Sequence, residues 1–290
     1  MKKRFWAAML SLAILSCTTL AAADVIDPLD NGSAPPGLFA LVTYFGQDNI
    51  PEVTDQDGNE YDFGLKASSM VIRPVYFIGQ VANKFTYGLN AIIPTVHLSL
   101  DSDNAFGAPS SNEFGLGDIG ISPFIFLYEN FDSQLFLSFW EFAFLPTGDY
   151  DKNNAVNIGR DTYWFQHQLA FGWYPGKFGI DANLNYFQYT ESDELNYEES
   201  DAVEVETVVH YALTDNFRVG LNAAYWIGVE GAKDNGVTIP DSEPMSFKLG
   251  LNLYYMMSES FSVGFRWMHT VDSENSTMGD SAYIKLAYVF

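Results

Sequence analysis

The final segment, residues 280–290, constrains the fold of this chain more than any other feature. Counting back in twos from Phe290 reaches only apolar residues: Tyr288, Leu286, Ile284 and Ala282. Lys285 lies in the other register. A period of two predicts a β-strand with one apolar face. Because a closing strand that ends on an aromatic residue is typical of bacterial outer-membrane β-barrels, we interpret Phe290 as an assembly signal for the barrel-assembly machinery.

The amino-terminus predicts export from the cytoplasm. Three basic residues, Lys2, Lys3 and Arg4, precede an apolar run, and Ala21 to Ala23 offer a small-residue cleavage site. Residues 1–23 are therefore predicted to be a secretory signal peptide. The residues before Cys17 loosely resemble a lipoprotein box, which leaves lipidation of Cys17 as an alternative. If Cys17 leaves with the signal, disulfides and thiol catalysis are excluded.

Composition excludes several other classes of protein. The chain has 14 Lys and Arg residues against 37 Asp and Glu residues, so it should repel nucleic acid. No apolar run approaches the ~20 residues that a membrane helix needs. Aromatic residues nevertheless make up 16% of the chain, and the mean hydropathy is −0.03. This combination suits a barrel, in which each apolar register alternates with a polar one.

Apolar and polar residues alternate along several segments: 85–93, 178–186, 203–209, 217–229, 247–255 and 261–267. Short links alternate with long acidic connections, which we place at residues 46–60, 100–113, 147–161, 190–201, 230–245 and 272–280. This asymmetry predicts an all-β, antiparallel, up-and-down transmembrane β-barrel. We predict twelve strands within residues 38–290, with ten or fourteen as alternatives. The Pro-rich residues 24–37 are predicted to be a periplasmic or lumen-plugging segment.

Side chains on the polar register of these strands are predicted to line the lumen. They are Asn90, Asp181, Asn183, Glu204, Glu206, His210, Arg218, Asn222, Lys248, Asn252, Arg266 and Lys285. The Asn residues of three Gly-Leu-Asn repeats form either a polar ring in a conduction path or a simple repetition of similar hairpins. The charges either line a selective pore or pair with one another and close a narrow lumen.

Two segments, residues 119–128 and 135–145, are apolar in both registers. Whichever face meets lipid, the other must present Phe, Leu or Trp to the interior. A water-filled pore does not need this, whereas a binding site for a hydrophobic molecule does. An inserted amino-terminal segment packed against the apolar face is the alternative. Glu141 is the lone charge in these segments, and either register is open to it.

Neither a metal site nor a catalytic site stands out. Residues 55–60 resemble a calcium loop, but Gly58 comes two positions early for the EF-hand pattern, so we expect solvated surface charge. The histidines are His97, His167, His210 and His269, and none lies in a nucleophile motif. We therefore expect no cofactor and no enzymatic activity. The acidic loops make divalent cations that bridge to lipopolysaccharide plausible partners.

Two Gly-rich motifs, residues 115–123 and 145–150, carry a family resemblance. With them the chain resembles the outer-membrane proteins grouped as "putative meta-pathway of phenol degradation". The resemblance implies uptake of small hydrophobic compounds, aromatic ones among them, across the outer membrane. The positions that match the motifs are Gly117, Asp118, Pro146 and Asp149. Turn and barrel-rim geometry explains them as well as substrate contact does.

Together these features predict a Gram-negative outer-membrane channel for passive uptake of small hydrophobic solutes. Its expected partners are outer-membrane lipid, lipopolysaccharide, the assembly machinery and the solutes themselves, with no nucleic acid. The alternative is a structural or surface-interaction barrel with a sealed lumen, whose acidic loops bind cations or lipopolysaccharide.

Overall fold

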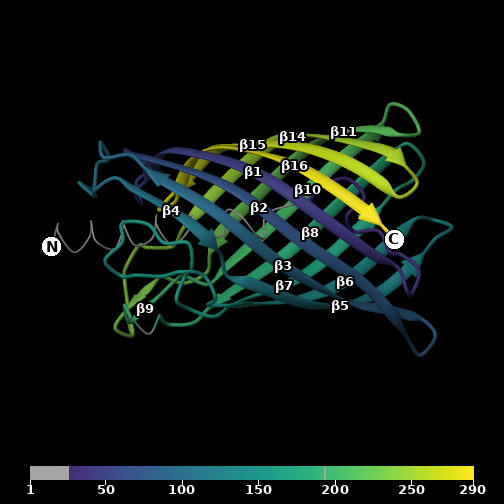
Figure 1. Ribbon diagram of the computed structural model, residues 1–290, viewed down its shortest axis with the longest axis horizontal. Helices are drawn as coiled ribbons and strands as arrows, with labels where there is room; N and C mark the ends of the chain where they lie inside the picture. Colours follow the sequence, from purple (N-terminus) through teal and green to yellow (C-terminus); the bar gives the residue numbers. More distant parts are fainter. Residues whose placement is uncertain (1–25, 193) are drawn as a thin grey trace.

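The computed structural model describes residues 26–192 and 194–290, which form a closed antiparallel barrel of twelve strands (Figure 1). The predicted fold class and strand number are confirmed. The wall consists, in chain order, of β1 (Phe39–Thr54), β2 (Glu60–Val81), β3 (Phe85–Leu100), the interrupted fourth strand β4 (Ser111–Leu116) and β5 (Ile119–Asn130), β6 (Leu135–Leu145), β7 (Trp164–Trp173), β8 (Phe178–Tyr189), β10 (Ala202–Ala212), β11 (Phe217–Gly228), β14 (Met245–Ser258), β15 (Phe261–Glu274) and β16 (Thr277–Val289). The predicted signal peptide and Cys17 lie outside the described residues. The part of the chain that the structure describes contains no helix that is long and apolar enough to cross a membrane.

The long connections gather at one end of the barrel and the carboxy-terminus lies at the other (Figure 1). Short turns mark the periplasmic end of such barrels, so the long connections are extracellular. Within them, the short strands β9 (Tyr197–Glu198), β12 (Lys233–Asp234) and β13 (Val237–Thr238) form a small separate sheet.

The first and last strands close the barrel. β1 pairs with β16 in a register that matches Ala40 with Val289 and Phe45 with Ile284. The backbone N–H of Phe290 donates to the carbonyl of Phe39 over 2.9 Å, and their ring centroids lie 5.4 Å apart. Closure satisfies the backbone groups that a free sheet edge would expose.

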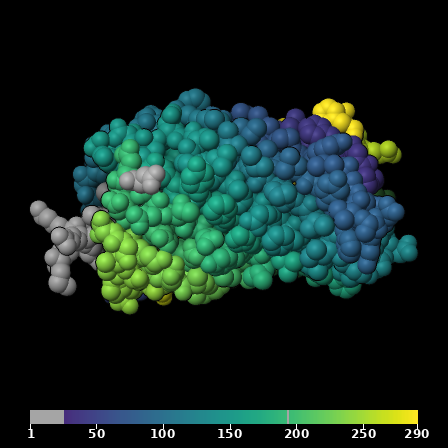
Figure 2. Space-filling view, turned by 90° about the horizontal axis from the view of Figure 1, so that it is seen from below, coloured from purple at the N-terminus to yellow at the C-terminus, as the bar shows by residue number. Residues whose placement is uncertain are grey.

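The period of two gives the wall an apolar outside and a mixed inside. Leu89, Leu221 and Leu251 are 45%, 65% and 51% exposed on the outer face, and the residue after each of them is a buried Asn. Figure 2 shows one face of the barrel as an unbroken surface of packed atoms. An apolar band around a closed barrel is what lipid requires, and the protein is an outer-membrane barrel.

Two predicted loops are wrong because their strands continue into them. β1 runs to Thr54 and β2 starts at Glu60, so the loop expected at residues 46–60 is reduced to residues 55–59. Only Asn275 and Ser276 separate β15 from β16, within the loop expected at 272–280. Polar residues here mark where the wall leaves the membrane. The ladder itself continues, because each backbone group still has a neighbouring strand to pair with, as Asp48 does with Ser281.

Candidate functional site

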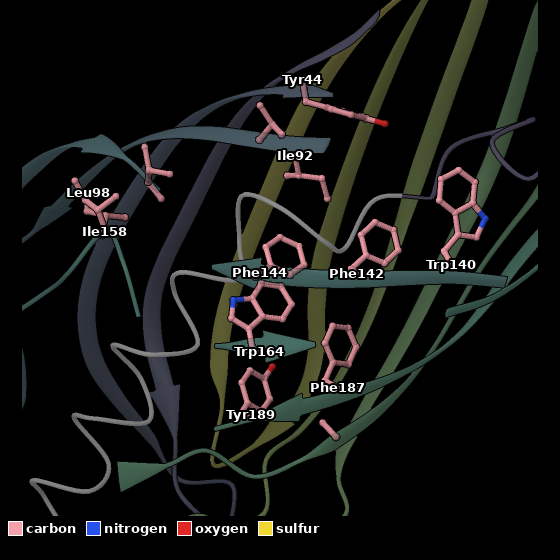
Figure 3. Close-up of a cluster of buried hydrophobic side chains, with 14 of the residues drawn as sticks. Tyr44, Ile92, Leu98, Trp140, Phe142, Phe144, Ile158, Trp164, Phe187 and Tyr189 are labelled. Carbon is pink, nitrogen blue, oxygen red and sulfur yellow. The ribbon is translucent and has the colours of Figure 1, made fainter. Parts of the chain in front are cut away.

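Aromatic side chains form a continuous inner wall across five strands. We define this aromatic wall as Phe77, Phe124, Trp140, Phe142, Phe144, Trp164 and Phe187, all of which are buried. Figure 3 shows its central rings from Trp140 to Phe187, with Phe144 over Trp164. The closest ring centroids are 3.6 Å apart between Phe144 and Trp164, with nearly parallel planes, and 4.0 Å apart between Phe124 and Trp140. The expectation that β5 and β6 turn aromatic residues inward is confirmed.

Strand β6 supplies the middle of this wall because every second residue from Phe136 to Phe144 faces inward. Glu141 lies in the other register, which settles the question left open by the sequence. Its carboxylate pairs with Nδ1 of His167 on the adjacent β7 at 2.7 Å, on the outer face of the barrel.

Residues 26–32, which we call the inserted segment, lie inside the barrel. The backbone N–H groups of Leu29 and Asn31 donate to the carboxylate of Asp181 at 2.9 and 3.0 Å. Asn222 donates to the carbonyl of Ile26 at 3.0 Å. Since Asp181 belongs to β8 and Asn222 to β11, the inserted segment connects different sides of the lumen.

Charged side chains hold the inserted segment as well. Lys285 on β16 pairs with Asp27 at 3.4 Å and also with Asp30. The amide of Asn252 donates to Asp27 at 2.7 Å. Lys285 and Asp27 are both buried, and buried charges of this kind persist only when they are paired and hydrogen-bonded.

The residues that the sequence assigned to the lumen occupy the inner face. All except the half-buried Arg218 and Lys248 are buried: Asn90, Asp181, Asn183, Glu204, Glu206, His210, Asn222, Asn252, Arg266 and Lys285. Asp181 and His210 meet at 3.2 Å, and Nη1 of Arg218 lies 3.2 Å from the other ring nitrogen of His210. Asn183 and Asn185 donate to Glu206 and Glu204 respectively. The acids of β10 are thus bonded to β8.

A cavity of about 280 Å³ is lined by both the inserted segment and part of the aromatic wall. Trp140 and Phe142 line one side, and residues 26–34 contribute to another. Arg73, Tyr44 and Gln166 add polar groups to the lining. Ligand pockets combine an apolar surface with a few polar groups in this way.

Sequence reasoning missed Arg73, which lies on β2 directly before Pro74. Counting in twos from the buried Val71 and Val75 would have placed Arg73 on the inner register. The pairing of β2 with β3 passes from Ile72 to Val75 because Pro74 has no N–H to donate.

The two family motifs meet at the extracellular rim. The carboxylate of Asp118, between β4 and β5, accepts the N–H of Gly148 at 2.9 Å and that of Arg160 at 3.0 Å. A side chain at Gly148 would bring its Cβ within 2.7 Å of Gly159 Cα, so the close approach of these loop segments requires glycine.

The remaining motif positions take part in the same geometry. Gly117 donates its N–H to the carbonyl of Pro94 at 2.9 Å, and the carbonyl of Asp149 accepts the N–H of Gly159 at 3.0 Å. Pro146 is exposed where the chain leaves β6. These contacts shape the 146–163 loop at the rim.

The loop at residues 55–59 is organised by its own hydrogen bonds. The Asp55 carboxylate accepts the N–H groups of Asp57 and Asn59 at 3.0 and 2.9 Å, and the hydroxyl of Tyr61 at 2.9 Å. Although burial opposes ionisation, these hydrogen bonds lower the pKa of Asp55 below its usual value. Across the described ranges no group of three or more His, Cys, Asp or Glu residues is arranged to hold a metal.

Comparison with known families gives the clearest assignment. Residues 48–286 match the model of the family described as "Putative MetA-pathway of phenol degradation". The chain belongs to this family. The family resemblance carried by residues 115–123 and 145–150 is therefore confirmed, and the match covers most of the chain. No curated protein matches the sequence.

Solved structures of other barrels are similar in fold to this family member. An outer membrane channel from Pseudomonas putida F1 has a TM-score of 0.82 at 17% identity, covering 92% of this chain and 100% of that chain. The β domain of the Bordetella autotransporter BrkA has a TM-score of 0.53 at 11% identity, with 88% and 100% covered. The transport unit of AIDA-I from Escherichia coli has 0.52 at 10%, with 95% and 96% covered. At these identities the likeness shows the fold alone.

Proposed function

We propose that this family member is an outer-membrane channel for passive uptake of small hydrophobic compounds, aromatic ones among them. The observation that carries the proposal is the cavity of about 280 Å³ beside Trp140 and Phe142. An apolar cavity of roughly 150 Å³ is enough to hold benzene. The space beside the aromatic wall therefore suits a substituted single ring.

The chemistry of the wall supports this solute class. An aromatic solute loses contact with water and stacks on rings that are already held in place, each good ring pair contributing about 0.5–1.5 kcal/mol. A channel for hydrated polar solutes has no need of rings on its inner face. We propose no catalytic step, and we assign the charged inner residues to holding the inserted segment and lining the path.

The proposal also assigns each expected partner to a part of the barrel. The apolar outer face is embedded in lipid, Phe290 is the signal for the assembly machinery, and the acidic extracellular loops contact lipopolysaccharide through divalent cations. In liposomes none of these partners is needed for permeation, so the transport proposal can be tested on purified protein.

The decisive test compares permeation of a small aromatic solute with that of a polar solute of similar size in proteoliposomes. We expect a preference for the aromatic solute in the wild type. In the double variant Trp140→Ala, Phe142→Ala this preference should fall about tenfold, because two stacking partners are lost. Phe139→Ala, on the outward face of the same strand, is the matched control and should keep it.

A preference that is absent in the wild type, with a correctly folded barrel, would sink the transport proposal. It would favour the alternative, a structural or surface-interaction barrel with a sealed lumen. The ion pairs of Lys285 with Asp27 and Asp30 support this alternative, because they fix the inserted segment across the lumen.

A further inference from the structure

Arg73 brings a positive charge into the barrel interior. Its guanidinium carbon lies 5.6 Å from the ring centroid of Trp140 and 5.9 Å from that of Phe142. Its Nε donates to the side-chain oxygen of Asn90 at 3.1 Å. Arg73 also lines the cavity of about 280 Å³.

No carboxylate in residues 26–192 or 194–290 pairs with Arg73, in contrast to Lys285, the other cation of the cavity lining. Lys285 is occupied by two Asp residues of the inserted segment. Arg73 is half-buried, and a guanidinium that has lost part of its hydration and has no counter-ion favours an anion that reaches it, because the anion replaces the lost hydration. The cation–π contacts with the wall offset only part of that loss.

Other polar atoms near Arg73 are also without partners in the described residues. These are Nδ2 of Asn90, which belongs to the amide that Arg73 already contacts, and Oε1 of Gln166 in the cavity lining. Both side chains are only 1% exposed. A free donor beside a guanidinium suits an anionic oxygen, and a free acceptor suits a hydroxyl group.

The geometry points to a binding site for monocyclic aromatic carboxylates, in which Arg73 takes the carboxylate and Trp140 and Phe142 take the ring. This assignment rests on the proposed function and narrows its solute class from hydrophobic compounds to aromatic acids. A planar guanidinium matches a carboxylate with two parallel hydrogen bonds, which a neutral ring cannot form. The cavity of about 280 Å³ has room for a single substituted ring, since roughly 150 Å³ is enough for benzene.

The acidic character of the chain does not contradict an anionic ligand. The formal net charge is −23, and much of it lies in the extracellular loops, so benzoate meets repulsion at the mouth. Screening by salt weakens that repulsion, while a contact with the half-buried Arg73 inside the barrel is screened less. Benzoate entry should consequently become faster as ionic strength rises.

The test is calorimetric binding of benzoate and of benzyl alcohol, a neutral molecule of similar shape, to the full barrel in detergent. We expect the wild type to bind benzoate more tightly. Arg73→Met should weaken benzoate binding at least tenfold and leave benzyl alcohol binding unchanged, because only the charge-assisted hydrogen bonds are lost. Lys84→Met removes a positive charge at the turn between β2 and β3, outside the cavity, and serves as the matched control.

Equal binding of the two compounds by the wild type, or benzoate binding that survives Arg73→Met, would overturn the assignment. Heat-modifiable migration shows whether the variant barrel has folded. If Arg73→Met does not fold, Arg73→Gln takes its place with the same expected loss, since glutamine can still donate to Asn90. Binding without permeation in liposomes would leave this site standing and reject the proposed uptake, so the two failures are distinguishable.

Discussion

At the scale of single residues, Asp55 shows how a segment that resembles a cation-binding loop can instead form a hydrogen-bonded turn. The Asp-rich residues 55–60 suggest a cation loop, yet the Asp55 carboxylate already accepts hydrogen bonds from Asp57, Asn59 and Tyr61. Its oxygens stabilise the turn between β1 and β2. The position of one carboxylate thus decides whether the loop is a ligand set or a closed turn.

The turn at Asp55 should depend on pH in a defined direction. Because the pKa of Asp55 is lowered in the folded barrel, its stabilisation is complete above the ordinary Asp value of about 3.9. It is lost as the pH falls through the lowered folded value. NMR titration of the Asn59 amide in micelles should therefore give a midpoint below about 3.9.

Two variants test whether Asp55 is the group that titrates at this turn. Asp55→Asn should remove the amide titration and increase proteolysis within residues 55–59. Asp57→Asn, whose side chain is exposed, should leave both unchanged. An Asn59 midpoint at or above the ordinary value would contradict the account.

At the scale of elements, β16 is the strand whose sequence pattern best predicts the fold. The alternation that ends at Phe290 predicts a strand, and its pairing with β1 completes the barrel. The same principle fails at the extracellular ends of β1 and β15, where polarity was read as a loop. Polarity reports where a strand leaves lipid, whereas strand length depends on whether a neighbour still offers hydrogen bonds.

Deletion of Phe290 should impair insertion of the barrel into the outer membrane. The deletion removes an aromatic residue that is 71% exposed, together with its hydrogen bond and ring contact to Phe39. We expect a clear loss of heat-modifiable, membrane-inserted protein in cell fractions. The control is Phe131→Ala, which removes an exposed aromatic side chain at another periplasmic turn. Equal amounts of inserted protein from the two variants would argue against Phe290 as the assembly signal.

At the scale of the whole molecule, closure brings opposite ends of the chain together. Lys285 and Asp30 are 255 positions apart, yet they form an ion pair inside the barrel. The inserted segment is held by residues from β8, β11, β14 and β16. We propose that this segment sets how far the channel is open.

Lys285→Met should release the inserted segment and raise single-channel conductance. The substitution leaves the buried Asp27 and the half-buried Asp30 without their cation, and breaking a buried pair typically costs about 3–5 kcal/mol. Planar-bilayer recording would measure the change, and faster proteolysis at residues 26–37 would accompany it. The control is Lys66→Met, because Lys66 pairs with Asp101 at 3.7 Å on the surface and both side chains are more than half exposed.

An unchanged conductance in Lys285→Met, with the barrel intact, would show that the ion pairs do not limit the opening. The carboxylate of Asp181 would then be the next anchor to remove. It accepts the backbone N–H groups of Leu29 and Asn31 without any help from Lys285.

The membrane barrel, its twelve strands and the apolar inner face of β5 and β6 could all be predicted from the amino-acid sequence. The barrel and its inner face follow from a period of two, which is local and needs only neighbouring residues, and the strand number follows from the alternation of short links with long connections. Even the inward position of Arg73 was within reach of the same count. Pro74, directly after Arg73, obscures the strand pattern at this point of the sequence.

The contacts of the inner residues, in contrast, could be known only from the folded barrel. The contacts of Asp118 with Gly148 and of Asn31 with Asp181 join residues that are distant in the chain, and among the described residues no carboxylate pairs with Arg73. Such contacts depend on barrel closure, strand register and the path of the inserted segment across the lumen. A periodic pattern states which side of the wall a residue faces, and the three-dimensional arrangement of the closed barrel selects its partner.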